Sequence, residues 1–411
     1  MRVLLSTWGS RGDVEPLAGL AVRLRELGAE VRVCAPPDEE FVALLDRAGV
    51  PLVPLGPTVR SVVTGTRPPS AADAFRLAPE LVAARFDTLT AAAEGCDVLV
   101  ATGLMPAGAR SVAEKLGIPY VYACFHPFGL PSPHLRPGAR PGTPSPQEES
   151  DLKVLWEQDD QRVNALYGEA ENTHRAAIGL PPVRSVRDHT FTDRPWLAAD
   201  PVLGPWQDVS HLDIVQMGAW FLPDERPLPQ ELEAFLDAGA PPVYVGFGSM
   251  ALHLSKDLAR VAIEAVRGYG RRVLLARGWA GLAPVDDRDD CFVVGEVNHQ
   301  ALFARVAAVM HHGGAGTTTA AARAGAPQVV VPQIADQPSW AARVAELGIG
   351  AAHDGPTPTV ESLSAVLATA LASGTRARAN AVAGTIRTDG TSVAAKMLFE
   401  AAGAEGPSVS A

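Results

Sequence analysis

The stretch HHGGAGTTTAAARAG carries the residues best suited to chemistry, because closely spaced glycines join an apolar strand to an alanine-rich helix. Gly313, Gly314 and Gly316 let the backbone approach a ligand closely, and we expect the helix to begin at Thr317. Unpaired N–H groups and the positive end of the helix dipole form an anion site at such a helix start. The His312 side chain can add a hydrogen bond or a positive charge to a phosphate oxygen. The pattern therefore predicts a phosphate-binding turn.

Other glycine-rich motifs fit this turn less well. A dinucleotide-binding GxGxxG follows the first strand of its unit and has an acidic residue downstream, which is not the arrangement here. The GK[ST] that ends a Walker loop is missing. His311 and His312 are adjacent, and no third ligand stands at a spacing suited to a metal site. A glycine-rich strand–helix turn without a ligand remains the alternative.

A second polar pair, Asp336 and Gln337, follows about twenty residues beyond this turn, after the apolar run VVVPQ. A carboxylate accepts hydrogen bonds and an amide both donates and accepts them, so the pair suits a polyhydroxylated ligand. An aspartate at a helix start is also a common helix cap. The position close to the predicted phosphate site favours the ligand-binding interpretation.

The N-terminal segment GSRGD follows a predicted buried strand, and we interpret it as a sharp turn. Arg11, Gly12 and Asp13 form an adhesion-type tripeptide, but the same residues also suit a solvated loop or the edge of an active site. Ser10 precedes them and can hydrogen-bond to Asp13 or to a ligand. The turn alone leaves these interpretations open.

Three further strand ends carry small or flat residues. GFGS ends at Ser249, ARGW contains Arg277, and GEVNHQALF contains Val297. Backbone amides at these ends, with the flat face of Arg277 or of Trp279, can hold a planar base. A packed tryptophan and a solvated arginine are the alternatives.

The elements that must position these residues alternate between apolar strands and helix-period segments. Val, Ile and Leu runs at 2–7, 31–35, 51–55, 97–101 and 120–124 read as strands, and Glu15 to Leu27 reads as a helix. Helices are predicted at 152–167 and 169–178, and the alternation resumes with strands at 243–247, 272–276, 291–295, 308–311 and 328–332. This pattern predicts an α/β protein with two doubly wound, Rossmann-like domains. Ligands bind at the carboxyl ends of such strands, so Asp13 should face Ser249, His312 and Asp336 across a cleft.

Composition restricts the function classes. The chain has 411 residues, 47% of them hydrophobic, and a formal net charge of −11, which argues against a nucleic-acid partner. Cys34, Cys96, Cys124 and Cys291 lie far apart without CxxC spacing and are expected to be free thiols. No run reaches the roughly 18 apolar residues of a membrane helix, and the N-terminus resembles no signal peptide. We expect a cytoplasmic protein without a membrane partner.

The sequence resembles the family 1 glycosyltransferases, which have the GT-B fold of two Rossmann-like domains facing a central cleft. Within that family it is most similar to the bacterial enzymes that glycosylate vancomycin-type glycopeptide aglycones. The resemblance spans nearly the whole chain and rests on GSRGD, CAPP, AAAEGC, SVAEKLGIPY, IGLPPV, LAADPVL, GAWFLPDERPLP, GEVNHQ, HHGGAGT and AHDGPTPT.

The resemblance implies a domain organisation and a reaction. It implies an acceptor-binding domain over 1–208, a linker over 209–228, a donor-binding domain over 229–386, and a helix over 387–411 that returns to the first domain. The loops 58–72 and 125–150, the second rich in Pro and Gly, would face the acceptor. The reaction would be inverting transfer from a nucleotide sugar, without a metal ion or other cofactor. We expect the enzyme to act as a monomer.

The resemblance also implies residue roles. Asp13 would be the general base, and Ser10, Arg11 and Gly12 would accompany it on the donor side of the turn, with the role of Arg11 open. The diphosphate would lie on His312, Gly313, Gly314, Gly316 and Thr317, with Ser249 opposite. The base would be bordered by Arg277 and the Val297 backbone, and Asp336 and Gln337 would bind sugar hydroxyls.

Two details bear on the substrates. Relatives that use deoxysugars on thymidine diphosphate tend to carry Ser or Asp where this chain has Gly313 and Gly314, so the expected donor is a UDP-sugar, with glucose favoured. Transfer of N-acetylglucosamine or of a TDP-deoxysugar, and epimerisation of a sugar nucleotide, are the alternatives. The expected acceptor group is a phenol, and a benzylic hydroxyl is the second candidate. An Asp of pKa about 4 is a weak base for a phenol of pKa about 10, so proton transfer should accompany sugar–phosphate cleavage, or burial should raise the pKa of Asp13.

Overall fold

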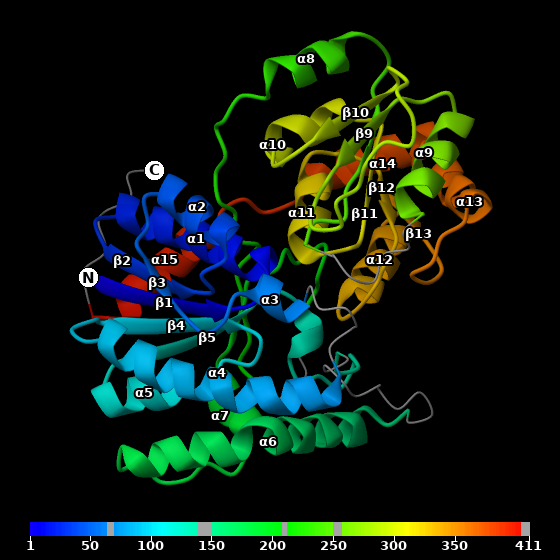
Figure 1. Ribbon diagram of the computed structural model, residues 1–411. Coiled ribbons are helices and arrows are strands. Elements are labelled where there is room, and N and C mark those ends of the chain that lie inside the picture. The colour runs from blue at the N-terminus through cyan, green and yellow to red at the C-terminus, as the bar shows by residue number, and fades with distance from the viewer. Residues whose placement is uncertain (64–69, 139–149, 208–211, 250–256, 404–411) are drawn as a thin grey trace.

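The computed structural model describes residues 1–63, 70–138, 150–207, 212–249 and 257–403. They form two units, each a parallel sheet with helices on both faces (Figure 1). Parts of the predicted acceptor loops (64–69 and 139–149), of the predicted linker (209–211) and of the C-terminal segment (404–411) lie outside the described residues. None of the described helices combines the length and the apolar character that a membrane span requires.

The first sheet has seven parallel strands within the described residues, in the order β3-β2-β1-β4-β5-β6-β7. The strands are β1 (Arg2–Trp8), β2 (Glu30–Ala35), β3 (Leu52–Pro54), β4 (Val98–Gly103), β5 (Tyr120–Cys124), β6 (Trp196–Leu197) and β7 (Val215–Gln216). β3 is an edge strand, as its prolines require. β7 falls inside the range 209–228 that was expected to be linker, and its pairing with β6 makes this part of the range an extension of the first sheet.

Helices cover both faces of this sheet because β1 buries its side chains on both sides. Val3 and Leu5 pack with one set of helices, and Leu4 packs with the other. The first set is α1 (Arg11–Glu26), α2 (Glu39–Arg47) and α15 (Gly390–Ala401). The second set is α4 (Ala71–Ala92), α5 (Ala109–Leu116), α6 (Leu152–Ala177) and α7 (Val186–Phe191). Two short helices, α3 (Val59–Val63) and η1 (Pro127–Gly129), follow the carboxyl ends of β3 and β5.

α6 is one continuous helix of 26 residues, so the predicted break between 167 and 169 is wrong. Gly168 lies at the predicted break, and glycine in a helix interior costs about 1 kcal/mol relative to alanine. Burial of Leu155, Val163 and Tyr167 against the first domain outweighs that cost.

The second sheet has six parallel strands within the described residues, in the order β10-β9-β8-β11-β12-β13. The strands are β8 (Val243–Val245), β9 (Val273–Ala276), β10 (Cys291–Val294), β11 (Ala308–His311), β12 (Gln328–Val330) and β13 (Gly350–Ala352). The helices are α8 (Gln230–Asp237), α9 (Leu258–Gly268), α10 (His299–Leu302), η2 (Phe303–Arg305), α11 (Ala315–Arg323), α12 (Gln337–Glu346), α13 (Val360–Ala370) and α14 (Ser373–Ala383). α9 and α13 pack on one face, and α8, α10 and α11 pack on the other.

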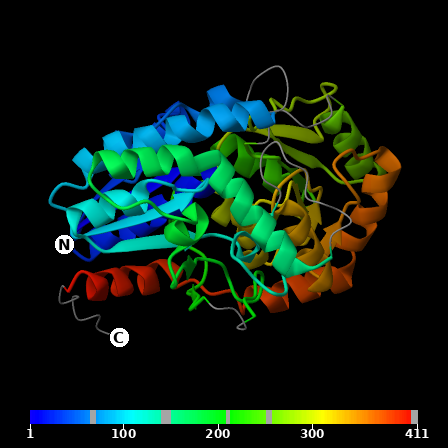
Figure 2. The same cartoon turned by 90° about the horizontal axis from the view of Figure 1, so that it is seen from below.

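The two units contact each other through α12 and through the C-terminal segment. Trp340 of α12 meets Phe128 of the first unit edge to face at 5.8 Å between ring centroids. The Arg343 guanidinium donates two hydrogen bonds, of 2.9 and 2.6 Å, to the Val202 carbonyl. α15 crosses back to the first unit, where Ala394 and Leu398 are buried in the same core as α1 (Figures 1 and 2).

Candidate active site

Both sheets have the strand order of a doubly wound fold, and their order reverses between the two central strands of each. The reversal lies between β1 and β4 in the first sheet and between β8 and β11 in the second. Ligands bind at such switch points, outside the carboxyl ends of the strands. GSRGD follows β1, GFGS follows β8 and HHGGAGT follows β11, so the predicted site segments lie at these points.

GSRGD is the start of a helix and not a sharp turn, so that prediction is wrong. α1 begins at Arg11, and the Ser10 side chain caps it by accepting a hydrogen bond from the Gly12 N–H at 3.3 Å. Gly9 and Gly12 suggested the turn, but Gly12 has no left-handed conformation and lies within the helix. A serine followed three residues later by an acidic residue is a helix-start signal, and here it prevails.

The Asp13 carboxyl lies over Gly9. A Cβ on Gly9 would lie 2.2 Å from Asp13 Oδ2, so any residue other than glycine would displace the carboxyl. Burial raises the pKa of Asp13 to about 7, and the negative charge of Asp336 adds to the rise. Hydrogen bonds from the Ser10 backbone and side chain, the latter at 3.4 Å, oppose it. Asp13 therefore changes protonation near neutral pH, as a general base should.

The HHGGAGT segment forms the predicted strand–helix turn, with a helix that starts two residues earlier than expected. Gly314 is the N-cap and α11 begins at Ala315, not at Thr317. The first backbone N–H groups of α11 have no acceptors within the helix and can bind an anion. A Cβ on Gly316 would meet no atom within 4 Å, so this exposed position faces open space.

Gly313 and Gly314 are required by their surroundings as well. Gly313 has a φ of +91°, a conformation that favours glycine, and a Cβ there would lie 2.8 Å from Val330. A Cβ on Gly314 would lie 2.5 Å from Nε2 of His312. The turn therefore requires glycine at both positions, and a side chain at Gly314 would displace the His312 ring.

The two histidines have different surroundings. Nδ1 of His311 accepts a hydrogen bond from the Gly313 N–H at 3.1 Å, so Nε2 carries the proton and donates to Gln328 at 2.9 Å. His311 thus supports the glycine turn from within the core, a role that the sequence pattern did not distinguish. Burial lowers the pKa of His312 to about 4, against the opposing charge of Asp336. Its buried Nδ1 has no hydrogen-bond partner among the described residues.

Asp336 and Gln337 lie at the start of α12, as predicted, but their side chains already have partners. Asp336 Oδ2 accepts a hydrogen bond from Trp340 Nε1 at 2.6 Å. Gln337 Oε1 accepts the N–H groups of Gln333 and Ile334 at 2.8 and 3.1 Å, so this amide holds the preceding loop. Asp336 is the more accessible of the two, since Gln337 is buried.

The other predicted donor residues lie on adjacent turns. The turn that ends at Ser249 contacts the glycine turn of HHGGAGT, since a Cβ on Gly248 would lie 3.3 Å from His312 Cε1. The Gly248 carbonyl accepts the Trp279 N–H at 2.9 Å, which joins GFGS to ARGW. The Arg277 side chain is exposed, and the backbone N–H of Arg277 donates to the Val294 carbonyl at 3.1 Å.

The side chains of Val297 and Trp279 pack against other parts of the protein. The Val297 side chain is buried in the core of the second unit. The Trp279 ring packs against the first unit, with the Arg60 guanidinium 5.7 Å from its centroid. Trp279 is thus part of the contact between the units.

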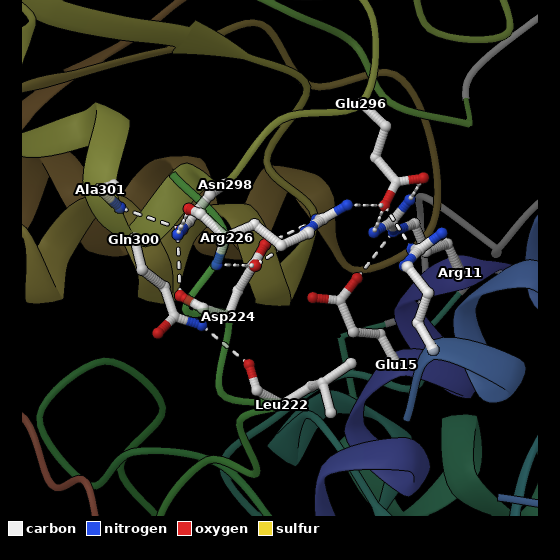
Figure 3. Close-up of polar contacts among 10 residues, drawn as sticks. Arg11, Glu15, Leu222, Asp224, Arg226, Glu296, Asn298, Gln300 and Ala301 are labelled. Atoms are coloured by element: carbon white, nitrogen blue, oxygen red, sulfur yellow. Dashed lines mark hydrogen bonds and ion pairs between the residues drawn. The ribbon is translucent and has the colours of Figure 1, made fainter. Parts of the chain in front are cut away.

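The Arg11 side chain pairs with two glutamates, one in each unit. Its Nε pairs with Glu15 at 2.7 Å, and its Nη1 pairs with Glu296 of the second unit at 3.2 Å (Figure 3). The pair with Glu296 joins the start of α1 to the second unit. Sequence reasoning missed this pair, because nothing local to Arg11 or Glu296 indicates a partner 285 residues away.

No group of three His, Cys, Asp or Glu side chains in the described residues is arranged to hold a metal ion. Cys34, Cys96, Cys124 and Cys291 are free thiols, as predicted. Burial raises the pKa of Cys124 to about 11, so the thiol beside Asp13 and Asp336 stays protonated.

Comparisons with known proteins identify both units. Residues 3–130 match the glycosyltransferase family 28 N-terminal domain, and residues 286–394 match the erythromycin biosynthesis protein CIII-like C-terminal domain. The chain is 61% identical to glycosyltransferase GtfE and 59% identical to vancomycin aglycone glucosyltransferase, both from Amycolatopsis orientalis, over 100% of each chain. It is 54% identical to dTDP-epi-vancosaminyltransferase from the same organism, again over 100% of each chain.

A solved structure of the glycosyltransferase of kitacinnamycin shares the fold, with a TM-score of 0.72 and 20% identity over 97% of this chain and 98% of that one. The predicted GT-B architecture is confirmed, and so is the resemblance on which it rested. With full-length identities of 59–61%, the chain belongs to the GT-B-fold glycosyltransferases of the vancomycin-type glycopeptide group.

Proposed function

We propose that the enzyme transfers glucose, with inversion, from UDP-glucose to a phenolic hydroxyl of a glycopeptide aglycone. The observation that carries this proposal is the Asp13 carboxyl, which lies at the unit boundary with a pKa of about 7 and within the electrostatic reach of Asp336. The 59% identical relative, named vancomycin aglycone glucosyltransferase, supports the choice of sugar and acceptor.

The proposed reaction is a single displacement. The acceptor oxygen attacks the anomeric carbon from the face opposite the nucleotide, and its proton passes to the Asp13 carboxylate. The bond between the anomeric carbon and the β-phosphate oxygen breaks, and UDP leaves with the electron pair. The products are the inverted glycoside and UDP, and the proton returns from Asp13 to solvent.

The raised pKa of Asp13 suits this step. An aspartate of pKa about 4 would face a phenol of pKa about 10 with a gap near 8 kcal/mol. At a pKa of about 7 the gap is about three pH units, or about 4 kcal/mol at ~1.4 kcal/mol per unit. Electrostatic stabilisation of the departing diphosphate can supply the remainder as the proton moves.

The donor would occupy the second unit. We assign its diphosphate to the start of α11, at Gly314, Gly316 and Thr317, where unpaired N–H groups point outward. The unpartnered His312 Nδ1 gives this site a further polar group, and Ser249 borders it. These groups would take up the charge of the leaving group without a metal ion, so activity should persist in a chelator.

The remaining donor contacts follow the adjacent turns. Asp336 would bind sugar hydroxyls, with Gln337 holding the loop beside it. The Val297 backbone and Arg277 would border the base. Ser10 and Gly12, at the start of α1, would face the donor from the first unit.

A TDP-deoxysugar is the second candidate donor, because dTDP-epi-vancosaminyltransferase is 54% identical to this chain. The glycine turn favours the UDP-sugar. A serine in place of Gly314 would bring its Cβ against His312 Nε2, 2.5 Å from the ideal position, and would displace that ring. The mass of the product distinguishes transfer of N-acetylglucosamine from transfer of glucose.

The test is incubation of the enzyme with UDP-glucose, UDP-N-acetylglucosamine and dTDP-deoxysugars, each with and without vancomycin-type aglycones, read by mass spectrometry in buffer containing EDTA. We expect a gain of one hexose from UDP-glucose, and a kcat at least about a hundredfold lower for Asp13→Ala with UDP binding retained. Near-normal turnover in Asp13→Ala would reject the assignment of the base. Consumption of donor without acceptor, with the sugar isomerised, would instead indicate an epimerase.

A further inference from the structure

Glu296 lies in the loop between β10 and α10, and three arginines from separate parts of the chain pair with its carboxylate. Arg11 Nη1 lies 3.2 Å from it, Arg47 Nη2 lies 2.6 Å from it, and Arg226 Nη1 lies 3.3 Å from it. Figure 3 shows the Arg11 and Arg226 side chains reaching Glu296 from opposite sides. Burial opposes the ionisation of Glu296, but the arginines prevail and hold the pKa of its carboxyl below the usual range.

Through Glu296, these arginines connect the first unit, the second unit and the segment between them. Arg11 is in the first turn of α1 and Arg47 ends α2, so both belong to the first unit. Arg226 lies between the units and is itself held by Asp224, through pairs of 2.8 and 2.6 Å. Glu296 belongs to the second unit, so one carboxylate connects both units and the segment between them.

The loop that carries Glu296 is fixed to the same segment by a second set of bonds. The Asn298 amide donates to the carbonyls of Asp224 and Arg226 at 2.8 and 2.9 Å, and its Oδ1 accepts the Ala301 N–H at 3.0 Å (Figure 3). The Gln300 amide donates to the Leu222 carbonyl at 2.8 Å. The orientation of the loop 296–298 is therefore tied to the segment 222–226.

The position of Glu296 relates it to both halves of the candidate site. It directly precedes Val297, whose backbone we assign to the border of the base. Its partner Arg11 stands two residues before Asp13 on the same helical turn. A displacement of Glu296 would thus change where Asp13 lies relative to the donor.

We propose that Glu296 is a positioning residue, which through Arg11 holds the start of α1 at the distance from the donor site that transfer requires. This inference rests on the proposed function. The pairing need not contribute much to stability, since partly exposed ion pairs contribute little. Its effect is on geometry, because a misplacement of about 1 Å between reacting groups can lower a rate about a hundredfold.

The test compares Glu296→Gln, Arg11→Gln and their combination. A matched control is Arg305→Gln, which removes an arginine that pairs with Glu233 and Asp237 inside the second unit and is 33% exposed, similar to the 29% of Arg11. kcat, KM and the UDP dissociation constant are measured, and small-angle X-ray scattering with and without UDP-glucose reports the spacing of the units.

We expect kcat to fall about tenfold in Glu296→Gln, with the UDP dissociation constant within about twofold of wild type and a larger radius of gyration. The double variant should lose no more kcat than Glu296→Gln alone, because the two residues act as one unit. Arg305→Gln should keep wild-type kcat and scattering.

Wild-type kcat and scattering in Glu296→Gln would overturn the inference, as would independent, multiplying losses in the double variant. The scattering result separates this inference from the proposed function. If the wild type transfers no sugar but Glu296→Gln still expands, the proposed function fails and the role of Glu296 in spacing the units stands.

Discussion

Asp13 of the first unit and Asp336 of the second face each other closely enough for the charge of Asp336 to raise the pKa of Asp13. Burial makes the larger contribution and brings that pKa to about 7. A carboxylate of one unit thus raises the basicity of a carboxylate of the other. The coupling gives the pH dependence of the reaction a specific form.

We predict that, at saturating UDP-glucose, kcat/KM for the acceptor rises with pH up to about 7 and then levels off. Asp13 must be ionised to accept a proton, so activity is lost below its pKa and retained above it. Asp336→Asn removes the repelling charge and should move this limb to lower pH, even if donor binding weakens. The measurement is kcat/KM between pH 5 and 9. A limb that Asp336→Asn leaves in place would exclude the coupling as its origin.

The sequence was sufficient for the architecture, and the reason is physical. Runs such as RVLLST are apolar on both faces, which only a sheet covered on both sides can bury. Glycine-rich strand ends then locate ligand sites at the carboxyl edges. The expected position of Asp13, facing the second domain, followed from its place at the carboxyl end of the first strand.

The details that were missed are of two kinds, local ones and ones that depend on contacts between distant residues. The start of α1 at Arg11 could have been predicted from Ser10 and Asp13, which form a local capping pattern. The Arg11–Glu296 pair could not, because it depends on how the two units pack. The hydrogen bond from Trp340 to Asp336 is local, because the two residues are four positions apart and lie on one face of the helix start.

Gly9 should matter for turnover because it leaves room for the Asp13 carboxyl. In Gly9→Ala the new methyl group would lie 2.2 Å from Asp13 Oδ2, so the carboxyl must move. We expect kcat to fall at least about tenfold with UDP binding retained, since the donor site is untouched. Gly268→Ala is the control, because a Cβ there meets no atom within 4 Å. If Gly9→Ala turns over like Gly268→Ala, the position of Asp13 over Gly9 is not the productive one.

Donor binding should be accompanied by proton uptake at His312. This histidine is neutral at pH 6 in the free enzyme, since burial lowers its pKa to about 4. A diphosphate beside it favours the charged ring and raises that pKa, so the complex holds more protons than the free enzyme and affinity falls as pH rises. Calorimetry of UDP-glucose binding at pH 5–6, in two buffers of different ionisation heat, measures the uptake. His312→Gln should abolish it, and equal uptake in both proteins would place the protonation elsewhere.

Trp340 should affect the binding of the sugar part of the donor without affecting the binding of the nucleotide part. Its Nε1 donates to Asp336 Oδ2 at 2.6 Å, and the side chain is 1% exposed. Trp340→Phe keeps an aromatic ring but removes a hydrogen bond to a charged group, worth about 1.5 kcal/mol, which corresponds to about tenfold in binding. We therefore expect the KM for UDP-glucose to rise about tenfold, while the UDP dissociation constant stays within about twofold.

Trp206→Phe is the matched control for that experiment, because the buried Trp206 Nε1 has no hydrogen-bond partner among the described residues. The same exchange there removes the indole N–H without freeing a carboxylate, so KM should not change. Equal losses of UDP and UDP-glucose affinity in Trp340→Phe would mean that the change disturbs the contact with Phe128 and the packing of α12. A selective loss of UDP-glucose affinity would assign Asp336, in the orientation that Trp340 gives it, to the sugar hydroxyls.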